Sequence, residues 1–139
     1  MTFAKATRVP IERTIGEIQK TLTKAGANKF GYMTHDNKAV VAFCFKNVGI
    51  KMAIKLPPQP SSNSTQASIK TYEQRHRQVY RQFLLCIKAK IEGVMCGVET
   101  LEQAFLPYIV LKDGTTVGQK AIPAIEQFNS SPASLLLGL

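Results

Sequence analysis

The sequence has no tryptophan and only two histidines, and acidic residues are scarce. Nine Asp and Glu stand against eighteen Lys and Arg among its 139 residues, so the formal net charge at pH 7 is +9 and the pI is about 9.7. A chain of this length is expected to form a single domain, residues 1–139. Its positive charge suits a polyanionic partner, because neutralised phosphates release condensed counterions. The alternative is that the charge serves solubility alone.

Long apolar runs are also missing. Phe83–Ile87 and Leu135–Leu137 are far shorter than the ~18 apolar residues that a helix needs to cross a bilayer. The opening residues, Met1 to Lys5, lack the apolar segment that is typical of a signal peptide. We therefore expect no membrane association and a cytoplasmic location.

The three cysteines form no Cys-x-x-Cys motif, and any bridging scheme leaves one of them unpaired. Cys44 and Cys86 lie within apolar patterns, where a cysteine behaves as a small hydrophobic residue of low reactivity. Disulfides are rare in reducing compartments, so this cysteine usage again favours the cytoplasm.

Motifs for catalysis are missing as well. No Gly-x-Ser-x-Gly, Walker or dinucleotide-binding glycine sequence is present. Glu73 and His76 form a single Glu-x-x-His pair, whereas di-metal carboxylate sites need two such pairs and further Glu residues. A metal-dependent nuclease that uses Asp36, Glu73 and His76 is the enzymatic alternative. We expect no enzymatic activity, no cofactor and no metal site.

The first periodic segment predicts a helix over residues 10–25. Apolar residues recur at spacings of three and four from Ile11 to Leu22. Pro10 is tolerated at a helix start, where its missing N–H costs nothing. Gly26 is a typical C-terminal stop.

The next segment alternates with period two, which is typical of half-buried strands. We predict three strands, over residues 29–34, 38–46 and 50–56. Turn residues separate them at His35–Asn37 and Asn47–Gly49, and connections this short make neighbouring strands antiparallel. Prolines and polar residues then predict a flexible Pro/Ser-rich loop over 57–65.

The remainder is predicted to be mainly helical. An apolar stripe predicts a long helix from about residue 65 to 97. A capping-box pattern at Thr100 starts a short helix that ends near Pro107. A small β-hairpin over 109–117 and a C-terminal helix over about 119–128 follow. The predicted fold class is therefore α+β: a helix, a three-stranded antiparallel β-meander and a long helix, then these smaller elements.

The first candidate binding surface is a basic face of the long helix. Its cations recur mainly at spacings of three, four and seven residues, which places them on or near one face: Lys70, Arg75, Arg77, Arg81 and Lys88. Glu73 is the only acid between the first of these and Lys90, so most of the cations lack an intrahelical partner. Arginine suits bidentate recognition of phosphate. The alternative is an ordinary solvated face.

The second candidate surface is the outer face of the predicted sheet. With Ile50 and Met52 pointing to the core, Lys51 and Lys55 point away, and antiparallel pairing places Lys46 on their face. A cationic sheet can follow a phosphate backbone. The alternative is that these lysines keep the face hydrated and discourage edge pairing.

A pattern along most of the chain comprises four segments: Thr7-Arg-Val-Pro, Ile87-Lys-Ala-Lys-Ile-Glu-Gly-Val, Thr100-Leu-Glu-Gln-Ala-Phe-Leu and Ile109-Val-Leu-Lys-Asp-Gly-Thr-Thr-Val-Gly. This pattern resembles a group of uncharacterised proteins encoded by phages, prophages and plasmids. The group supplies no activity and no functional residues to carry over. The resemblance implies a mobile-element gene expressed in a bacterial cytoplasm, a setting rich in DNA-handling proteins and in inhibitors of host defence.

We hypothesise a non-enzymatic nucleic-acid-binding protein of a phage or mobile element, a class that includes single-strand binding and annealing proteins. The element order is similar, at the level of topology, to the double-stranded-RNA-binding domain and to the core of phage single-strand annealing proteins, without a motif match. The alternative is a phage-encoded, anti-CRISPR-like inhibitor that binds a host protein or a nucleotide signal. A structural or assembly factor is the third hypothesis. The expected partner is DNA or RNA, or an acidic host protein surface, and a homo-oligomer is compatible with the sequence.

Overall fold

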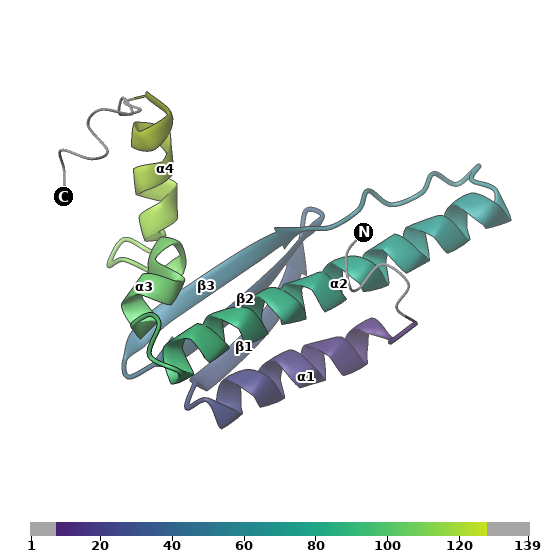
Figure 1. The fold of residues 1–139 in the computed structure, drawn as a ribbon. Helices are drawn as coiled ribbons and strands as arrows, with labels where there is room; N and C mark the ends of the chain where they lie inside the picture. The colour runs from purple at the N-terminus through teal and green to yellow at the C-terminus, as the bar shows by residue number, and fades with distance from the viewer. Residues whose placement is uncertain (1–7, 128–139) are drawn as a thin grey trace, which may run out of the picture.

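A computed structural model gives the structure of the chain and describes residues 8–127. Helices and an antiparallel sheet follow one another along the chain (Figure 1). The elements are α1 (Ile11–Lys24), β1 (Asn28–His35), β2 (Lys38–Phe45), β3 (Val48–Lys55), α2 (Gln66–Met95), α3 (Leu101–Phe105), the 3-10 helix η1 (Leu106–Tyr108) and α4 (Val117–Gln127). The predicted α+β class, with its β-meander and long helix, is confirmed.

Helix α1 buries one stripe and ends at a glycine. Thr14, Ile18 and Leu22, four residues apart, are fully buried, as the helical spacing predicts. Pro10 lies just before the first helical turn, and its carbonyl accepts the Thr14 N–H at 3.2 Å. Gly26 has a φ of +107°, which is the left-handed conformation that favours glycine just beyond a helix end.

The sheet has the order β1–β2–β3, and both of its turns contain two residues with positive φ. Asp36 and Asn37 form the first turn, whereas Lys46 and Asn47 form the second. Such two-residue turns match the twist of the flanking strands. The second turn was predicted at Asn47–Gly49, and this was wrong by about one residue, because a non-glycine pair adopts positive φ here.

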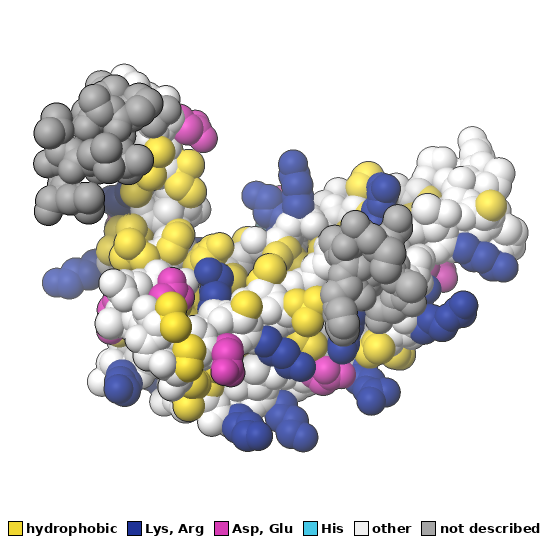
Figure 2. All heavy atoms as spheres, viewed as in Figure 1, with side chains coloured by type: hydrophobic (Ala, Val, Ile, Leu, Met, Phe, Trp, Pro, Cys, Tyr) yellow, Lys and Arg dark blue, Asp and Glu magenta, His cyan; other side chains and the backbone are white. Residues whose placement is uncertain are grey.

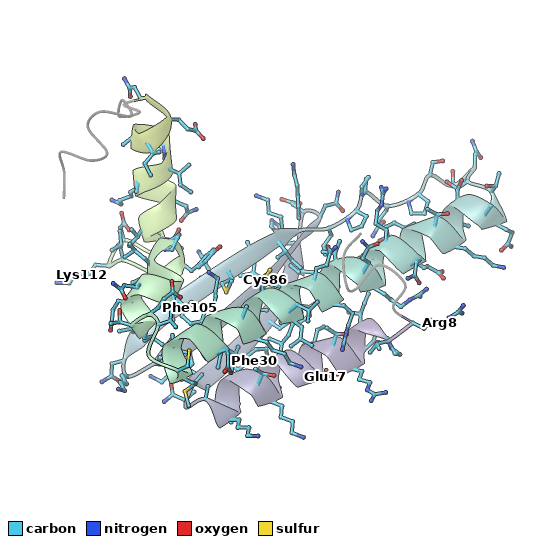
Figure 3. All side chains as sticks on the ribbon, viewed as in Figure 1. Arg8, Glu17, Phe30, Cys86, Phe105 and Lys112 are labelled. Atoms are coloured by element: carbon cyan, nitrogen blue, oxygen red, sulfur yellow. The ribbon has the colours of Figure 1, made fainter. Side chains whose placement is uncertain are left out.

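Helices α1 and α2 lie side by side over the same face of the sheet (Figure 1). The sheet contributes alternate residues of β2 and β3 to the core, including Val41, Phe43 and Ile50, each 1% exposed. Phe105 of α3 closes one end of this core, with its ring 5.8 Å from that of Phe43 (Figure 3). On the opposite face of the sheet, Met33 is 59% exposed.

Helix α2 has 30 residues, and its first turns extend beyond the sheet (Figure 1). Thr65 caps it, since its hydroxyl accepts the Ser68 N–H at 3.1 Å. The predicted helix over residues 65–97 is therefore confirmed to within two residues. Despite this length, none of the helices within residues 8–127 is apolar enough to cross a membrane.

The predicted small hairpin over 109–117 is present in a minimal form. Val110 and Thr116 form a single antiparallel bridge, and the Leu111 N–H donates to the Thr115 carbonyl at 2.7 Å. Thr116 ends the extended segment because it caps α4: its N–H donates to the Gln119 side chain at 2.7 Å, and its hydroxyl accepts the Gln119 N–H. Ile109 bridges Ile50 of β3 and so ties this region to the sheet edge.

The cysteines are more accessible than their apolar sequence context predicts. Cys86 is exposed on α2 (Figure 3), and Cys96 is exposed after its end. Only Cys44, on the outer face of β2, is half-buried. The expectation of an apolar environment was wrong for Cys86, because the helical rotation turns this position to solvent while Phe83 and Ile87 face the core.

Candidate nucleic-acid interface

The positive charge is concentrated in the part of the chain that forms α1, the sheet and most of α2. Sixteen of the eighteen Lys and Arg precede residue 91, together with only four of the nine Asp and Glu. On the face visible in Figure 2, Lys and Arg side chains are spread along this part of the molecule. The net positive charge of the chain therefore belongs to the helix–sheet body and not to the C-terminal part of the sequence.

Three lysines share the outer face of the sheet, and we call Lys38, Lys51 and Lys55 the lysine face. The antiparallel register places Lys38 directly opposite Lys55, and both are exposed. Like charges directly opposite each other destabilise a strand pair. The only acid from Asn28 to Lys55 is Asp36, which pairs with His35 at 2.9 Å. The sheet thus holds cations together with little negative charge to offset them.

Two of the lysine positions agree with the sequence analysis and one does not. Lys51 and Lys55 point away from the core, as predicted, and Lys51 Nζ lies 3.5 Å from the Gly114 carbonyl oxygen. Lys46 lies in the second hairpin turn, at the end of β2 that is remote from Lys38. There it lines an apolar pocket of about 360 Å³ beside Phe45. Its placement on the lysine face was wrong, because the turn begins one residue earlier than predicted.

The basic face of α2 is partly an interface with α1. Lys70, Arg75 and Lys88 are exposed, in agreement with a binding surface. Arg81, however, is only 23% exposed and donates to Glu17 Oε1 at 3.0 Å (Figure 3 labels Glu17 on α1). The prediction concerned acids within α2, and the acid that pairs with Arg81 comes from another helix, so Arg81 is not one of the free cations of this face.

Arg77 lies on the same side of α2 and is half-buried. Its Nη2 donates to Gln74 Oε1 at 2.9 Å. Its Nε is buried and has no hydrogen-bond partner within the described part of the chain. Arg77 and Arg81 therefore differ from the exposed cations of α2, and Lys70, Arg75 and Lys88 are the better candidates for contacts with phosphate.

A polar pocket of about 590 Å³ lies where the β1–β2 turn meets the N-terminal half of α2. We call it the aromatic pocket, because three of the four tyrosines and both histidines of the chain line it: Tyr32, Tyr72, Tyr80, His35 and His76. Asp36, Asn37 and Leu56 also contribute to its wall, and Glu12 of α1 stands at its edge.

The aromatic rings of the pocket form one connected group. The ring of Tyr72 is stacked on that of His76, with centroids 5.3 Å apart and an angle of 20° between the planes. His76 meets Tyr80 edge-on at 5.4 Å. The hydroxyl oxygens of Tyr80 and Tyr32 are 2.6 Å apart, a hydrogen bond between α2 and β1. This arrangement offers a flat aromatic shelf beside two polar hydroxyl groups.

Burial favours the neutral forms of two groups at the centre of this pocket, Tyr80 and His76. Desolvation raises the pKa of Tyr80, and the hydrogen bond with Tyr32 raises it further. Desolvation lowers the pKa of His76 below its ordinary value of 6.5. Both shifts favour the uncharged forms of His76 and Tyr80, which suits stacking with an aromatic ligand.

Sequence analysis did not find this pocket, although one signal was present. Tyr72, His76 and Tyr80 recur every four residues and so share one face of α2. The nuclease alternative grouped Asp36, Glu73 and His76, but Glu73 is exposed and does not line the pocket. Within residues 8–127, no three His, Cys, Asp or Glu side chains are arranged to hold a metal ion.

Comparisons with known proteins give no relative from which to transfer a function. No family model, curated protein or solved structure matches the chain. The resemblance to phage- and plasmid-encoded proteins thus stays a prediction, and function is inferred from the lysine face and the aromatic pocket.

Proposed function

We propose that the protein binds nucleic acid without catalysing a reaction on it, and that the lysine face forms the main phosphate contacts. The observation that carries this proposal is the direct opposition of Lys38 and Lys55 across β2 and β3. Ammonium groups on directly opposed residues repel each other, and a phosphate bound between them is attracted to both.

The dimensions of the lysine face suit a phosphate backbone. Lys51 and Lys55 are four residues apart on β3, so their Cα atoms are separated by about 13 Å at the usual rise of a strand. A phosphate backbone that runs along β3 can therefore present more than one phosphate to these two lysines. Lysine acts as a point charge, and phosphate contacts carry no direct sequence information. The proposal is therefore binding with little sequence specificity.

The proposal is tested by fluorescence anisotropy with a labelled 20-nucleotide single strand and the corresponding duplex. We expect a Kd in the micromolar range or below at 50 mM salt. The affinity should fall steeply by 200 mM salt, because each displaced counterion adds to the slope. Absence of binding to both oligonucleotides at 50 mM salt would refute the proposal.

A second candidate function is inhibition of a host protein. One observation favours it, the exposure of apolar side chains on η1 and α4. Leu106 is 51%, Ile122 50% and Ile125 63% exposed, along η1 and α4. Figure 2 shows apolar side chains gathered along α4. Exposed apolar patches of this kind occur at protein interfaces. A pull-down from bacterial lysate with nuclease treatment distinguishes the two functions: a stoichiometric protein that is retained after digestion supports the second.

A further inference from the structure

We infer that the aromatic pocket receives one unpaired base of a single-stranded nucleic acid whose backbone passes over the lysine face. This inference rests on the proposed function and specifies its partner as single-stranded DNA or RNA. Four features of the structure support it: the continuity of the two surfaces, the size of the pocket, its stacked rings and the sign of its charges.

The pocket and the lysine face are adjacent. Asn37 and Leu56 both line the pocket, and they are joined by a hydrogen bond from the Leu56 N–H to the Asn37 carbonyl at 2.8 Å. The next residues along β2 and β3 are Lys38 and Lys55. A phosphate bound between these two lysines therefore lies at the same end of the sheet as the pocket, but on the outer face, whereas the stacked rings of α2 lie on the helix side. The strand has to pass around the end of the sheet at the β1–β2 turn, so that its base enters the pocket while its phosphate stays on the lysines.

The size and lining of the pocket suit a planar heterocycle. Its volume of about 590 Å³ falls within the ~300–1,000 Å³ typical of sites for small ligands. Tyr72 and His76 provide a stacked aromatic shelf, and Tyr32, at 36% exposure, is accessible from solvent. Stacking on aromatic side chains is tolerant of sequence because every base has a π-face. The hydroxyl of Tyr32, the more exposed partner of the 2.6 Å hydrogen bond with Tyr80, is the group that can exchange a hydrogen bond with the edge of a base.

Charge directs the base inward and the phosphate outward. Glu12 and Asp36 stand at the pocket, so an anionic phosphate is repelled from it. The lysines next to Asn37 and Leu56 attract the same phosphate on the outer face of the sheet. A base in a duplex is stacked on both sides and paired, so it has to leave the helix before it can enter such a pocket. The geometry therefore favours a single strand.

The inference is tested with a single-stranded oligonucleotide that carries 5-iodouracil, a base that forms a covalent bond with a nearby aromatic side chain on irradiation. We expect the cross-link to map by mass spectrometry to Tyr72, His76 or Tyr32. Tyr72→Ala should lose the cross-link and weaken single-strand binding about tenfold, whereas Tyr72→Phe should retain both, because the stacking surface is kept. Tyr108→Ala, which changes the one tyrosine outside the pocket, is the matched control.

The outcomes separate this inference from the proposed function. If the single strand binds but the cross-links on the unmodified protein map only outside the pocket, the inference is wrong and the proposed function stands. If the duplex binds more tightly than the single strand, the inference is likewise wrong and the proposed function stands. If neither oligonucleotide binds, both fail together. The cross-link map of the unmodified protein does not depend on a variant, so unfolding of Tyr72→Ala leaves the test decisive.

Discussion

The hydroxyl groups of Tyr32 on β1 and Tyr80 on α2 form a 2.6 Å hydrogen bond across the interface between sheet and helix. The two partners differ in environment, since Tyr80 is 2% exposed and Tyr32 is 36% exposed. Water can therefore replace a lost partner of Tyr32 more easily than a lost partner of Tyr80. The pair joins the helix layer to the sheet at the floor of the aromatic pocket.

This asymmetry predicts unequal effects of two conservative substitutions. Tyr32→Phe leaves the buried Tyr80 hydroxyl without its partner and should lower the free energy of unfolding by about 1–2 kcal/mol. Tyr80→Phe leaves an accessible hydroxyl on Tyr32 and should lower it by only about 0.5 kcal/mol. Urea unfolding of the two variants measures the difference. Equal effects would contradict the assignment of Tyr80 as the desolvated partner.

The ion pair between Arg81 and Glu17 is predicted to stabilise the packing of α1 on α2. A double-mutant cycle with Arg81→Gln and Glu17→Gln should give a coupling energy of about 0.5–1 kcal/mol, as expected for a partly exposed pair. Arg13 supplies the control, because it is 73% exposed and lies 3.7 Å from the same carboxylate. The cycle of Arg13 with Glu17 should give about 0.3 kcal/mol or less. A larger coupling for Arg13 would refute the structural role of Arg81.

The spacing of apolar residues allowed most helices and strands to be predicted from the sequence. Within each element, this spacing marks the face that is buried. The spacing from Ile18 to Leu22 and the alternation through Phe43 are local signals, and α1, the sheet and α2 formed where these signals lie. The second hairpin turn was misplaced because Lys46 adopts a positive φ that its residue type does not indicate.

The candidate functional surfaces are formed by residues that are distant in the sequence and meet only in the folded chain. Local sequence patterns do not show which of these residues meet. Sequence analysis selected Lys51 and Lys55 correctly as outward residues, but Lys38 was missed because its position opposite Lys55 requires the strand register. The partner of Arg81 lies 64 positions away on α1. The aromatic pocket combines residues from α1, β1, the first turn, the segment after β3 and α2, so no single stretch of sequence reveals it.

The burial of His76 predicts a pH dependence of stability. Its folded-state pKa lies below the unfolded value of 6.5, so the unfolded chain binds more protons between these two pKa values. The contribution of His76 to the free energy of unfolding should therefore be constant above about pH 7 and decrease as the pH falls from 6.5 toward the folded pKa. His76→Gln should remove this decrease, whereas His35→Gln, at the exposed histidine, should retain it. Urea unfolding between pH 5 and 8 measures both, and an unchanged profile in His76→Gln would contradict the prediction.

Lys38 is predicted to lower the stability of the protein and to raise its affinity for nucleic acid. Lys38→Glu places a carboxylate opposite Lys55 and replaces a like-charge pair by an opposite-charge pair. The free energy of unfolding should rise by about 0.2–1 kcal/mol, while the affinity for nucleic acid should fall. Lys20→Glu on α1 is the control of equal charge change, and it should leave the affinity nearly unchanged. A Lys38→Glu variant that is both less stable and equally tight in binding would refute the role assigned to this lysine.

The salt dependence of single-strand binding tests the central claim most directly. The variant with all three lysines of the lysine face changed to Gln is compared with a control of equal charge loss, Lys20→Gln, Lys24→Gln and Lys112→Gln. Each phosphate contact contributes about 0.7 to the slope of log Kd against log salt for a single strand. Because Lys38 and Lys55 share one phosphate and Lys51 contacts another, we predict that the slope falls by about 1.4 in the lysine-face variant and by less than about 0.7 in the control. Equal decreases in the two variants would contradict the claim, because binding would then follow net charge and not the lysine face.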